Sequence, residues 1–413
     1  MGELLSVADA QTLVLDAFSP TEAVLSELNR AAGRVLGETI CSDQDLPHFD
    51  NSSMDGFAVR SKDVLLASLD TPVGLKVVAD IPAGQAVPVI LQEGESARIM
   101  TGAPIPDGAD AVVPVEETDR YTLQSAAPLP NRVEIYKPVR PGDYIRIAGQ
   151  DVRRGDIVLE AGRRLRSQDV GLLAMLGRAS VYLHRKPCVA YFSSGDELIP
   201  LGAPLSAGKV YDSNSFTLAA LLEKYGAVGI PLGIVADQIG AVESTLEKAV
   251  GEKVDLIISS AGVSVGAFDY VRAALEKNGS IGFWRVDMRP GKPLTFGSYR
   301  DIPFIGLPGN PVSAFIGFEV FVRPVLNRLS GLPAEVREYR LCYLAQQIES
   351  DGRESFLRAI VEFDDGRWIA RLTGHQGSGN LRSLVQANAL LLIPSGVKSL
   401  PVGAMVKAWT LDG

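Results

Sequence analysis

The sequence predicts a multidomain protein of the α/β plus β class, and three features of the chain support this fold class. A chain of 413 residues is too long to fold around a single hydrophobic core, and 46% of its residues are apolar. Strand-like and helix-like segments alternate from residue 188 to residue 329, which is typical of a three-layer domain built on a parallel sheet. Short β-branched runs, separated by glycine and proline, precede and follow that region and predict two further β-rich modules.

The first 180 residues are expected to be helical, then β-rich, then helical again. Between residues 8 and 34 apolar positions recur every three or four residues, with Ser19 and Thr21 as cap candidates, so two helices are expected. Residues 46–149 contain short runs such as GLKVVADI, ESARIM and ADAVVPVEE, which predict a small β-rich module. A further helix is expected from Ser167 to Leu176.

The central region alternates predicted strands with predicted helices. The strands are CVAYF (188–192), VGIPLGIV (228–235) and VDLIISS (254–260), and the helices are 213–227, 241–250 and 268–279. Gly226 and Gly279 stand where helices end, and Asp212 or Ser213 stands where one begins. Two more strands, GFWRVDM and IPFIGL, precede a helix at 311–329.

The residues after Pro333 return to short strands. Turn signals occur at Asp351-Gly352, at Asp365-Gly366 and at residues 377–380. This spacing predicts a compact β-barrel or sandwich.

Composition excludes several classes of protein. The net charge of −9 argues against a general binder of nucleic acids or anionic membranes, so an anionic ligand would need a local basic pocket. Cys41, Cys188 and Cys342 are far apart and are expected to be reduced, buried thiols. With only three histidines, any metal is expected on oxygen ligands. No signal sequence and no run of 18 apolar residues occurs, which predicts a cytoplasmic protein.

Four turns that follow predicted strands are candidates for the binding site, because parallel α/β sheets bind ligands at the carboxyl ends of their strands. Ser193–Glu197 places two carboxylates there, although an acidic helix start explains it too. The glycine-rich loop 261–266 is suited to a phosphate. It also fits a plain tight turn, or a GxSxG hydrolase elbow in which Ser264 is the nucleophile and His375 the base.

The other two turns offer cations and a helix start. Residues 285–293 gather Arg285, Arg289 and Lys292 between prolines, which suits an oxyanion, although a solvated charged loop remains an alternative. Residues 306–313 place Asn310 at a helix N-cap and Pro311 at the first helical position. Such a helix start favours anions, and a purely structural helix start is the alternative.

Seven segments together resemble the MoeA family, which is related to the C-terminal part of gephyrin. They are LPHFDNSSMDGFAV (46–59), RIMTGAPIPDGADAVVPVEE (98–117), SSGDEL (193–198), YDSNS (211–215), GVSVGAFDY (262–270), RPGKP (289–293) and GLPGNPVSA (306–314). The resemblance covers nearly the whole chain, in the family's order.

The resemblance implies a four-domain, L-shaped subunit that works as a homodimer with its site between subunits. Its parts would be an elongated linking domain (1–45 with 146–180), a β-rich lid (46–145), a three-layer parallel α/β molybdopterin-binding domain (181–327) and a C-terminal β-barrel (333–413). The implied reaction takes adenylylated molybdopterin and molybdate, releases AMP and leaves molybdenum on the dithiolene. A molybdopterin adenylyltransferase and a non-catalytic, gephyrin-like scaffold are the alternatives.

The resemblance also implies the site residues. Catalytic roles fall on Glu197, Asp269, Asp55, Asp151 and Asp237, with Glu197 and Asp269 as ligands of Mg²⁺. Substrate would be bound by Thr101, Arg146, Gly262, Ser264, Gly266, Arg285, Arg289, Lys292, Pro308, Gly309, Asn310 and Pro311. Contacts with a molybdopterin adenylyltransferase and with molybdoenzyme chaperones are further expectations, whereas nucleic-acid and membrane partners are not expected.

Overall fold

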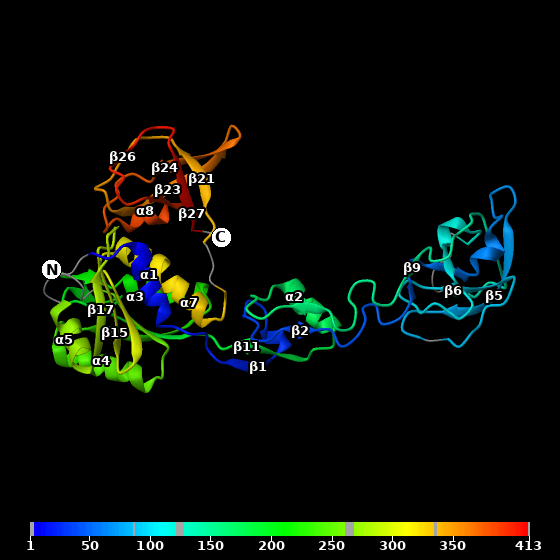
Figure 1. Ribbon diagram of the computed structural model, residues 1–413, viewed down its shortest axis with the longest axis horizontal. Helices are drawn as coiled ribbons and strands as arrows, with labels where there is room; N and C mark the ends of the chain where they lie inside the picture. The colour runs from blue at the N-terminus through cyan, green and yellow to red at the C-terminus, as the bar shows by residue number, and fades with distance from the viewer. Residues whose placement is uncertain (1–3, 86, 121–127, 261–267, 334–336, 412–413) are drawn as a thin grey trace. The chain divides into compact units, whose positions relative to one another are not determined.

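A central mixed sheet organises the larger of two compact units in the chain (Figure 1). The computed structural model describes residues 4–85, 87–120, 128–260, 268–333 and 337–411. Unit 1 comprises residues 1–38, 161–171 and 178–413, and unit 2 comprises residues 39–160 and 172–177. The finer division into four domains stays a prediction.

The sheet of unit 1 has six strands in the order β15-β12-β16-β20-β19-β17. The four strands β15 (Val228–Val235), β12 (Cys188–Ser194), β16 (Leu256–Ser260) and β20 (Ile302–Leu307) run parallel. Strand β19 (Pro293–Tyr299) is antiparallel to β20, and β17 (Gly279–Arg285) is antiparallel to β19. The carboxyl end of β17 therefore lies at the same edge as the carboxyl ends of the four parallel strands.

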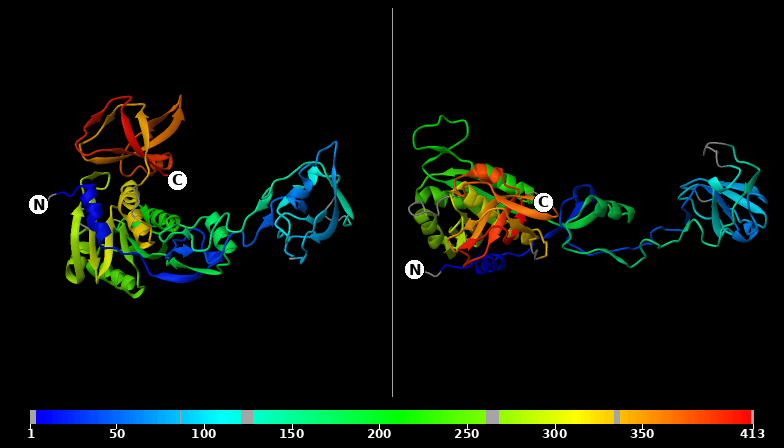
Figure 2. Two further views of the ribbon diagram at one scale, coloured as in Figure 1. Left: turned by 45° about the vertical axis from the view of Figure 1, so that its right-hand side comes forward. Right: turned by 90° about the horizontal axis from the view of Figure 1, so that it is seen from above.

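Helices cover both faces of this sheet (Figure 2). One face packs on α1 (Val7–Asp16), α3 (Asn214–Lys224) and the continuous run of α6 (Pro311–Gly317), the π-helix η4 (Phe318–Val322) and α7 (Arg323–Leu329). The other face packs on α4 (Ile239–Gly251) and α5 (Phe268–Asn278). The predicted three-layer α/β domain is thus confirmed, with an antiparallel edge added to its parallel strands.

The C-terminal strands close into a barrel, as predicted. Strands β23 (Glu354–Asp364), β24 (Arg367–Leu372), β21 (Arg340–Leu344), β27 (Met405–Thr410) and β25 (Ala389–Ile393) pair in that order, and β25 pairs with β23 again. Strand β18 (Met288–Arg289) also pairs with β23, so the loop after β17 is joined to the barrel. The smaller elements are β22 (Ile348–Glu349), β26 (Ser399–Leu400) and α8 (Leu381–Val385).

Unit 2 is built on a five-stranded sheet in the order β7-β4-β6-β5-β8, which confirms the predicted β-rich module. Its strands are β7 (Ala111–Pro114), β4 (Gly56–Val59), β6 (Glu95–Ile99), β5 (Val73–Ile81) and β8 (Arg132–Ile135). Two buried clusters of apolar side chains pack around this sheet. The pairs β3 (Asn51–Ser52) with β9 (Ile145–Arg146), and β2 (Ile40–Cys41) with β10 (Ile157–Leu159), complete its strands.

Short elements complete the description. They are the 3₁₀ turns η1 (Leu28–Arg30), η2 (Ser61–Val64) and η3 (Val115–Glu117), the helix α2 (Ser167–Met175), and the strand pair β13 (Leu198–Ile199) and β14 (Val210–Tyr211). Among the described helices, none has the length and apolar character needed to span a membrane.

One prediction about local structure was wrong. The expected second helix near the N-terminus is strand β1 (Ala23–Glu27), which pairs with β11 (Ser180–His184). Its backbone bonds to a partner about 155 residues away, which no local pattern reveals. Gly279 directly follows the last residue of α5, as predicted, and it also begins β17, where a Cβ would lie 1.9 Å from the carbonyl oxygen of Ser298. Strand β19 was not anticipated.

Candidate functional site

The four predicted binding turns all start where strands of the central sheet end, and three of these strands, β12, β16 and β20, are neighbours. The parallel register pairs Ser194 of β12 with Val235 of β15 and pairs Ser260 of β16 with Leu307 of β20. Three of the four predicted binding turns directly follow β12, β16 and β20, and the fourth follows the carboxyl end of β17. We call this edge with its loops the strand-end site.

Three carboxylates gather at one part of the strand-end site. The carboxylate of Glu197 lies over Gly195, where an added Cβ would be 2.6 Å from one oxygen. Asp196 accepts a hydrogen bond from the backbone N–H of Asp237 at 3.2 Å. Burial raises the pKa of Asp237, and the negative charges of Asp196 and Glu197 raise it further. Like charges held together in this way create a demand for a cation or a proton.

The remaining predicted carboxylate and the glycine-rich loop cannot be placed. Gly262, Ser264 and Gly266 belong to residues 261–267 and lie outside the described residues, and so does the side chain of Asp269. In the part of the chain that is described, no group of three or more His, Cys, Asp or Glu side chains forms a ready metal cage.

A buried polar network holds two of the loops together. The side-chain amide of Asn214, at the start of α3, donates to Ser260 Oγ at 2.6 Å and to the carbonyl of Gly309 at 2.8 Å. The Oδ1 atom of Asn214 and the hydroxyls of Ser194 and Ser259 are buried without a partner among the described atoms. Unpaired buried polar atoms are rare in native proteins, so their concentration at this edge is a feature of a binding site.

The turn between β20 and α6 has the predicted helix start. Asn310 is the N-cap with an extended backbone, and Pro311 occupies the first helical position. The Asn310 side chain makes no capping hydrogen bond and is exposed, as is Gly309, whereas Pro308 is buried. The N–H of Val312 bonds to the carbonyl of Ser378 in the barrel. The barrel therefore borders the strand-end site.

The predicted cations lie on the loop that joins β17 to β19. Arg285 ends β17 and is exposed, while Arg289 lies in β18 against Ser355 of the barrel. One Nη of Arg289 is 3.9 Å from a carboxylate oxygen of Asp351. Lys292 has no carboxylate within ion-pair distance among the described residues, and its carbonyl accepts from Val286 at 3.1 Å. Positive charge is thus available to an anion at this edge.

A further cation, Arg358, was not predicted from the sequence. It lies in β23 with no exposed surface, and it donates to Ser383 Oγ at 3.1 Å and to the carbonyl of Gly377 at 2.9 Å. Its Nη1 atom has no partner among the described residues. Burial lowers the pKa of Arg358 to about 10, and the nearby charge of Arg289 contributes. The guanidinium groups of Arg289 and Arg358 are therefore close enough for their charges to interact.

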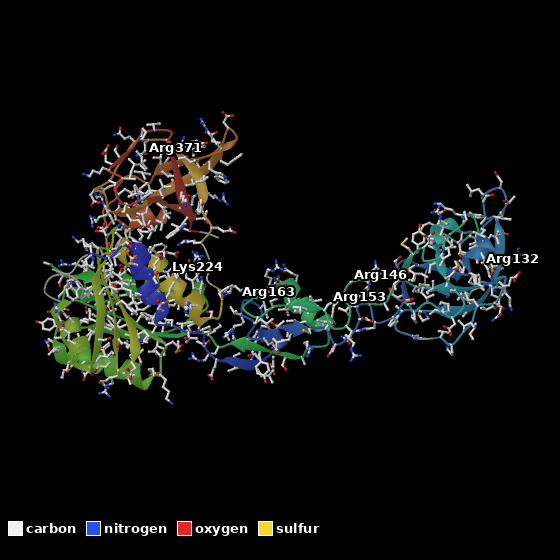
Figure 3. All side chains as sticks on the ribbon, viewed as in Figure 1. Arg132, Arg146, Arg153, Arg163, Lys224 and Arg371 are labelled. Atoms are coloured by element: carbon white, nitrogen blue, oxygen red, sulfur yellow. The ribbon has the colours of Figure 1, made fainter. Side chains whose placement is uncertain are left out.

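The remaining predicted residues form two pairs in unit 2. The carboxylate of Asp55 accepts from the N–H and the hydroxyl of Thr101, both at 2.7 Å. Arg146, labelled in Figure 3, pairs with Asp151 at 2.5 Å, and both side chains are about half exposed. The loop that contains β3 links the pairs, because Asn51 pairs with Arg146 and Ser52 accepts from the N–H of Gly102.

Comparison with known proteins relates the whole chain to one group. The family models that match are described as MoeA N-terminal region (domain I and II) over residues 5–177, probable molybdopterin binding domain over 190–328 and MoeA C-terminal region (domain IV) over 342–411. A molybdopterin molybdenumtransferase of Nostoc is 40% identical and covers 92% of this chain and 87% of its own. Molybdopterin molybdenumtransferase 2 of Mycobacterium tuberculosis is 38% identical, covering 98% and 99% respectively. The crystal structure of the molybdopterin biosynthesis MoeA protein of Pyrococcus horikoshii matches with a TM-score of 0.82 and 31% identity, over the full length of both chains.

Proposed function

The chain belongs to the MoeA family, and we propose that it is a molybdopterin molybdenumtransferase that inserts molybdenum from molybdate into adenylylated molybdopterin and releases AMP. The observation that carries this proposal is the strand-end site, which holds a cluster of carboxylates after β12 and β15 and cations on the 285–292 loop and in the adjoining barrel. The substrates are anions, and an acidic chain binds them only where positive charge is concentrated.

The cations are assigned to the oxyanions. Molybdate is a compact dianion, for which forked guanidinium donors and an ammonium group are suitable partners. Arg289, Lys292 and Arg358 supply these donors, and the unpaired Nη1 of Arg358 is satisfied when an oxyanion binds. Arg285 and the turn 308–311 extend the same basic edge toward the phosphate groups of the pterin substrate.

The carboxylates are assigned to Mg²⁺ and to proton transfer. Glu197 and Asp237, with Asp269, supply the oxygen donors that Mg²⁺ prefers, and this ion is commonly held by only one or two carboxylates together with substrate phosphates. When bound, Mg²⁺ polarises a phosphoanhydride as a Lewis acid. Burial and the neighbouring carboxylates raise the pKa of Asp237, which favours a role for this carboxyl group in proton transfer.

A homodimer is part of the proposal. Leu25 of β1 and Tyr182 of β11 are directly opposed in register and 62% and 46% exposed, so this strand pair presents an apolar surface suited to a second copy. Light scattering of the purified protein should give about twice the 44.1 kDa chain mass. A monomer at micromolar concentration would contradict this part.

The decisive experiment mixes the purified protein with adenylylated molybdopterin, molybdate and Mg²⁺ and follows AMP by chromatography. Molybdate-dependent AMP release is expected. Adenylylation of molybdopterin by ATP would instead identify an adenylyltransferase. A binding-only scaffold would do neither. Contacts with an adenylyltransferase that supplies the substrate are then testable by co-elution.

A further inference from the structure

Two adjoining cavities lie at the opposite edge of the central sheet, where its parallel strands begin. The first, of about 380 Å³, is lined in part by Lys186 and Gly226, two residues before β12 and β15 respectively. The second, of about 530 Å³, shares Arg164 and Lys224 with the first. We call the two together the amino-edge cleft. Because the strand-end site occupies the carboxyl edge, the amino-edge cleft is a separate feature.

Cations dominate the lining of the amino-edge cleft. The first cavity is lined by four cations, Arg34, Arg164, Lys186 and Lys224, and by one carboxylate, that of Glu223. A fifth cation in its lining, Arg185, is paired with carboxylates. Arg164, Lys224 and Arg323 line the second cavity, which has no carboxylate among its lining residues, although Arg323 is paired with Glu319 at 3.6 Å. The whole chain carries a net charge of −9. This local reversal of charge is what an anion site in an acidic protein requires.

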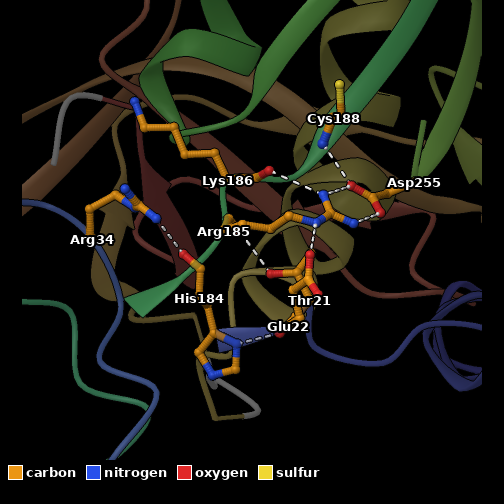
Figure 4. A network of polar contacts seen from close by, with 8 residues as sticks. All are labelled: Thr21, Glu22, Arg34, His184, Arg185, Lys186, Cys188 and Asp255. Carbon is orange, nitrogen blue, oxygen red and sulfur yellow. Dashed lines mark hydrogen bonds and ion pairs between the residues drawn. The ribbon is translucent and has the colours of Figure 1, made fainter. Parts of the chain in front are cut away.

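Arg185 shows how an arginine next to the cleft is neutralised when its role is structural (Figure 4). Its guanidinium bonds to both carboxylate oxygens of Asp255, at 2.6 and 2.7 Å, and lies 3.6 Å from Glu22. Arg34 differs, because it donates only to the carbonyl of His184 at 2.8 Å. Burial lowers the pKa of Arg34, and no carboxylate opposes that effect. A partly buried charge without a counter-charge favours binding of an anion.

The two lysines are also without carboxylate partners. Among the described residues no carboxylate lies within ion-pair distance of Lys186 or Lys224. Lys224 donates to the carbonyl of Leu411 at 2.8 Å. Its place in the last turn of α3 is favourable for a cation on helix-dipole grounds. That argument does not apply to Arg34 or Lys186, which lie outside the helices and still face the same cavity.

We propose that the amino-edge cleft is a second anion-binding site, which takes a small molecule carrying a diphosphate group. Several cations spread over two connected cavities exceed what a single phosphate needs, and their volumes lie in the range of small-molecule sites. Arginine forks and lysine charges both suit phosphate oxygens. Inorganic pyrophosphate and a nucleoside diphosphate share this chemistry.

Lysine footprinting on the whole protein tests the proposal. The protein is acetylated for short times with and without pyrophosphate or ADP, and modified peptides are quantified. Lys186 and Lys224 should be modified several-fold more slowly in the presence of ligand, while Lys248 on α4 is unaffected. Protection by ADP alone identifies a nucleotide as the source. Lys292 reports the strand-end site in the same experiment, so binding of the ligand there is distinguished from binding in the amino-edge cleft, and the proposed function is tested separately by AMP release. Unchanged modification of Lys186 and Lys224 with both compounds overturns the proposal.

A matched pair of variants provides the second test. Lys224 and Lys248 are both exposed and both lie in the last turn of a helix, but only Lys224 lines the cleft. Lys224→Gln should weaken pyrophosphate binding roughly tenfold in calorimetry, the effect of one lost charge-assisted hydrogen bond. Lys248→Gln should leave it unchanged. Equal affinity of the two variants would overturn the proposal.

Discussion

Replacing Arg289 with alanine should weaken the use of molybdate without destabilising the fold. The Arg289 side chain is 39% exposed, and its guanidinium is 3.9 Å from Asp351. Asp351 already accepts a 3.0 Å hydrogen bond from Arg353, so it does not depend on Arg289. Loss of one charge-assisted hydrogen bond costs about 1.5–3 kcal/mol, and partial exposure favours the lower end. The molybdate concentration for half-maximal AMP release should therefore rise roughly tenfold.

Arg371 provides a matched control for this variant. It lies in β24 of the same barrel, is 53% exposed, and its guanidinium is 3.8 Å from Glu362 (Figure 3). Both arginines thus form similar surface ion pairs, each worth at most about 1 kcal/mol. Arg289→Ala and Arg371→Ala should shift the melting temperature equally little. Only the first should change the molybdate requirement.

The assay titrates molybdate at saturating adenylylated molybdopterin and measures AMP. Lys292→Ala should shift the half-saturating molybdate concentration in the same direction, and pterin binding should weaken less in both variants. An unchanged half-saturation in Arg289→Ala and Lys292→Ala would remove these residues from the anion site. A comparable shift in Arg371→Ala would show that overall charge, rather than position, is responsible.

Three further results are expected. Glu197→Gln and Asp269→Asn should keep the circular dichroism spectrum and slow AMP release at least about tenfold, because Mg²⁺ ligands or proton carriers are lost. Asp237→Asn should raise the melting temperature at neutral pH. A raised pKa means that the native carboxyl binds its proton more tightly than the carboxyl of the unfolded chain, so wild-type stability falls as pH rises through that pKa, whereas the asparagine variant lacks this decline. Glu319→Leu should destabilise the protein by about 3–5 kcal/mol in denaturant, because it removes the carboxylate that lies 2.8 Å from the largely buried guanidinium of Arg337. Adding Arg337→Met should recover most of this loss, since the buried guanidinium is then removed together with its partner.

The layered architecture could be predicted because each layer has its own sequence period. Buried parallel strands such as Cys188–Ser194 are continuous apolar runs, whereas α3 and α4 place apolar residues every three or four positions. The β1 segment could not be predicted, since Ala23–Glu27 becomes a strand only through its distant partner β11. At Gly279 the sequence located the end of α5 but did not show that β17 begins there. The absent Cβ of Gly279 makes room for Ser298, a neighbour that only the folded sheet supplies.

The strand-end residues could be predicted because chain order itself places them. A turn after a parallel strand lies at the ligand edge in any doubly wound sheet, and this argument locates Glu197 and Pro308 without coordinates. Arg358 carries no such signal, because it lies in the C-terminal barrel, 69 positions beyond Arg289 in the chain. The only hint was an arginine within the otherwise apolar run FLRAIV (356–361), in the region predicted to form short strands. An inward-facing charge in a strand is a reason to suspect a site.

Arg358 allows a structural role to be separated from a functional one. A fall in its pKa from the ordinary 12.5 to about 10 corresponds to about 3 kcal/mol of destabilisation of the buried charge. Arg358→Met removes that cost, but it leaves the Gly377 carbonyl and the Ser383 hydroxyl without their donor, at about 1–3 kcal/mol. The two effects nearly cancel, so the free energy of unfolding should change by less than about 2 kcal/mol while molybdate use falls at least about tenfold. A loss of about 3–5 kcal/mol, typical of breaking a structural buried pair, with molybdate use intact would instead make Arg358 a structural element of the barrel.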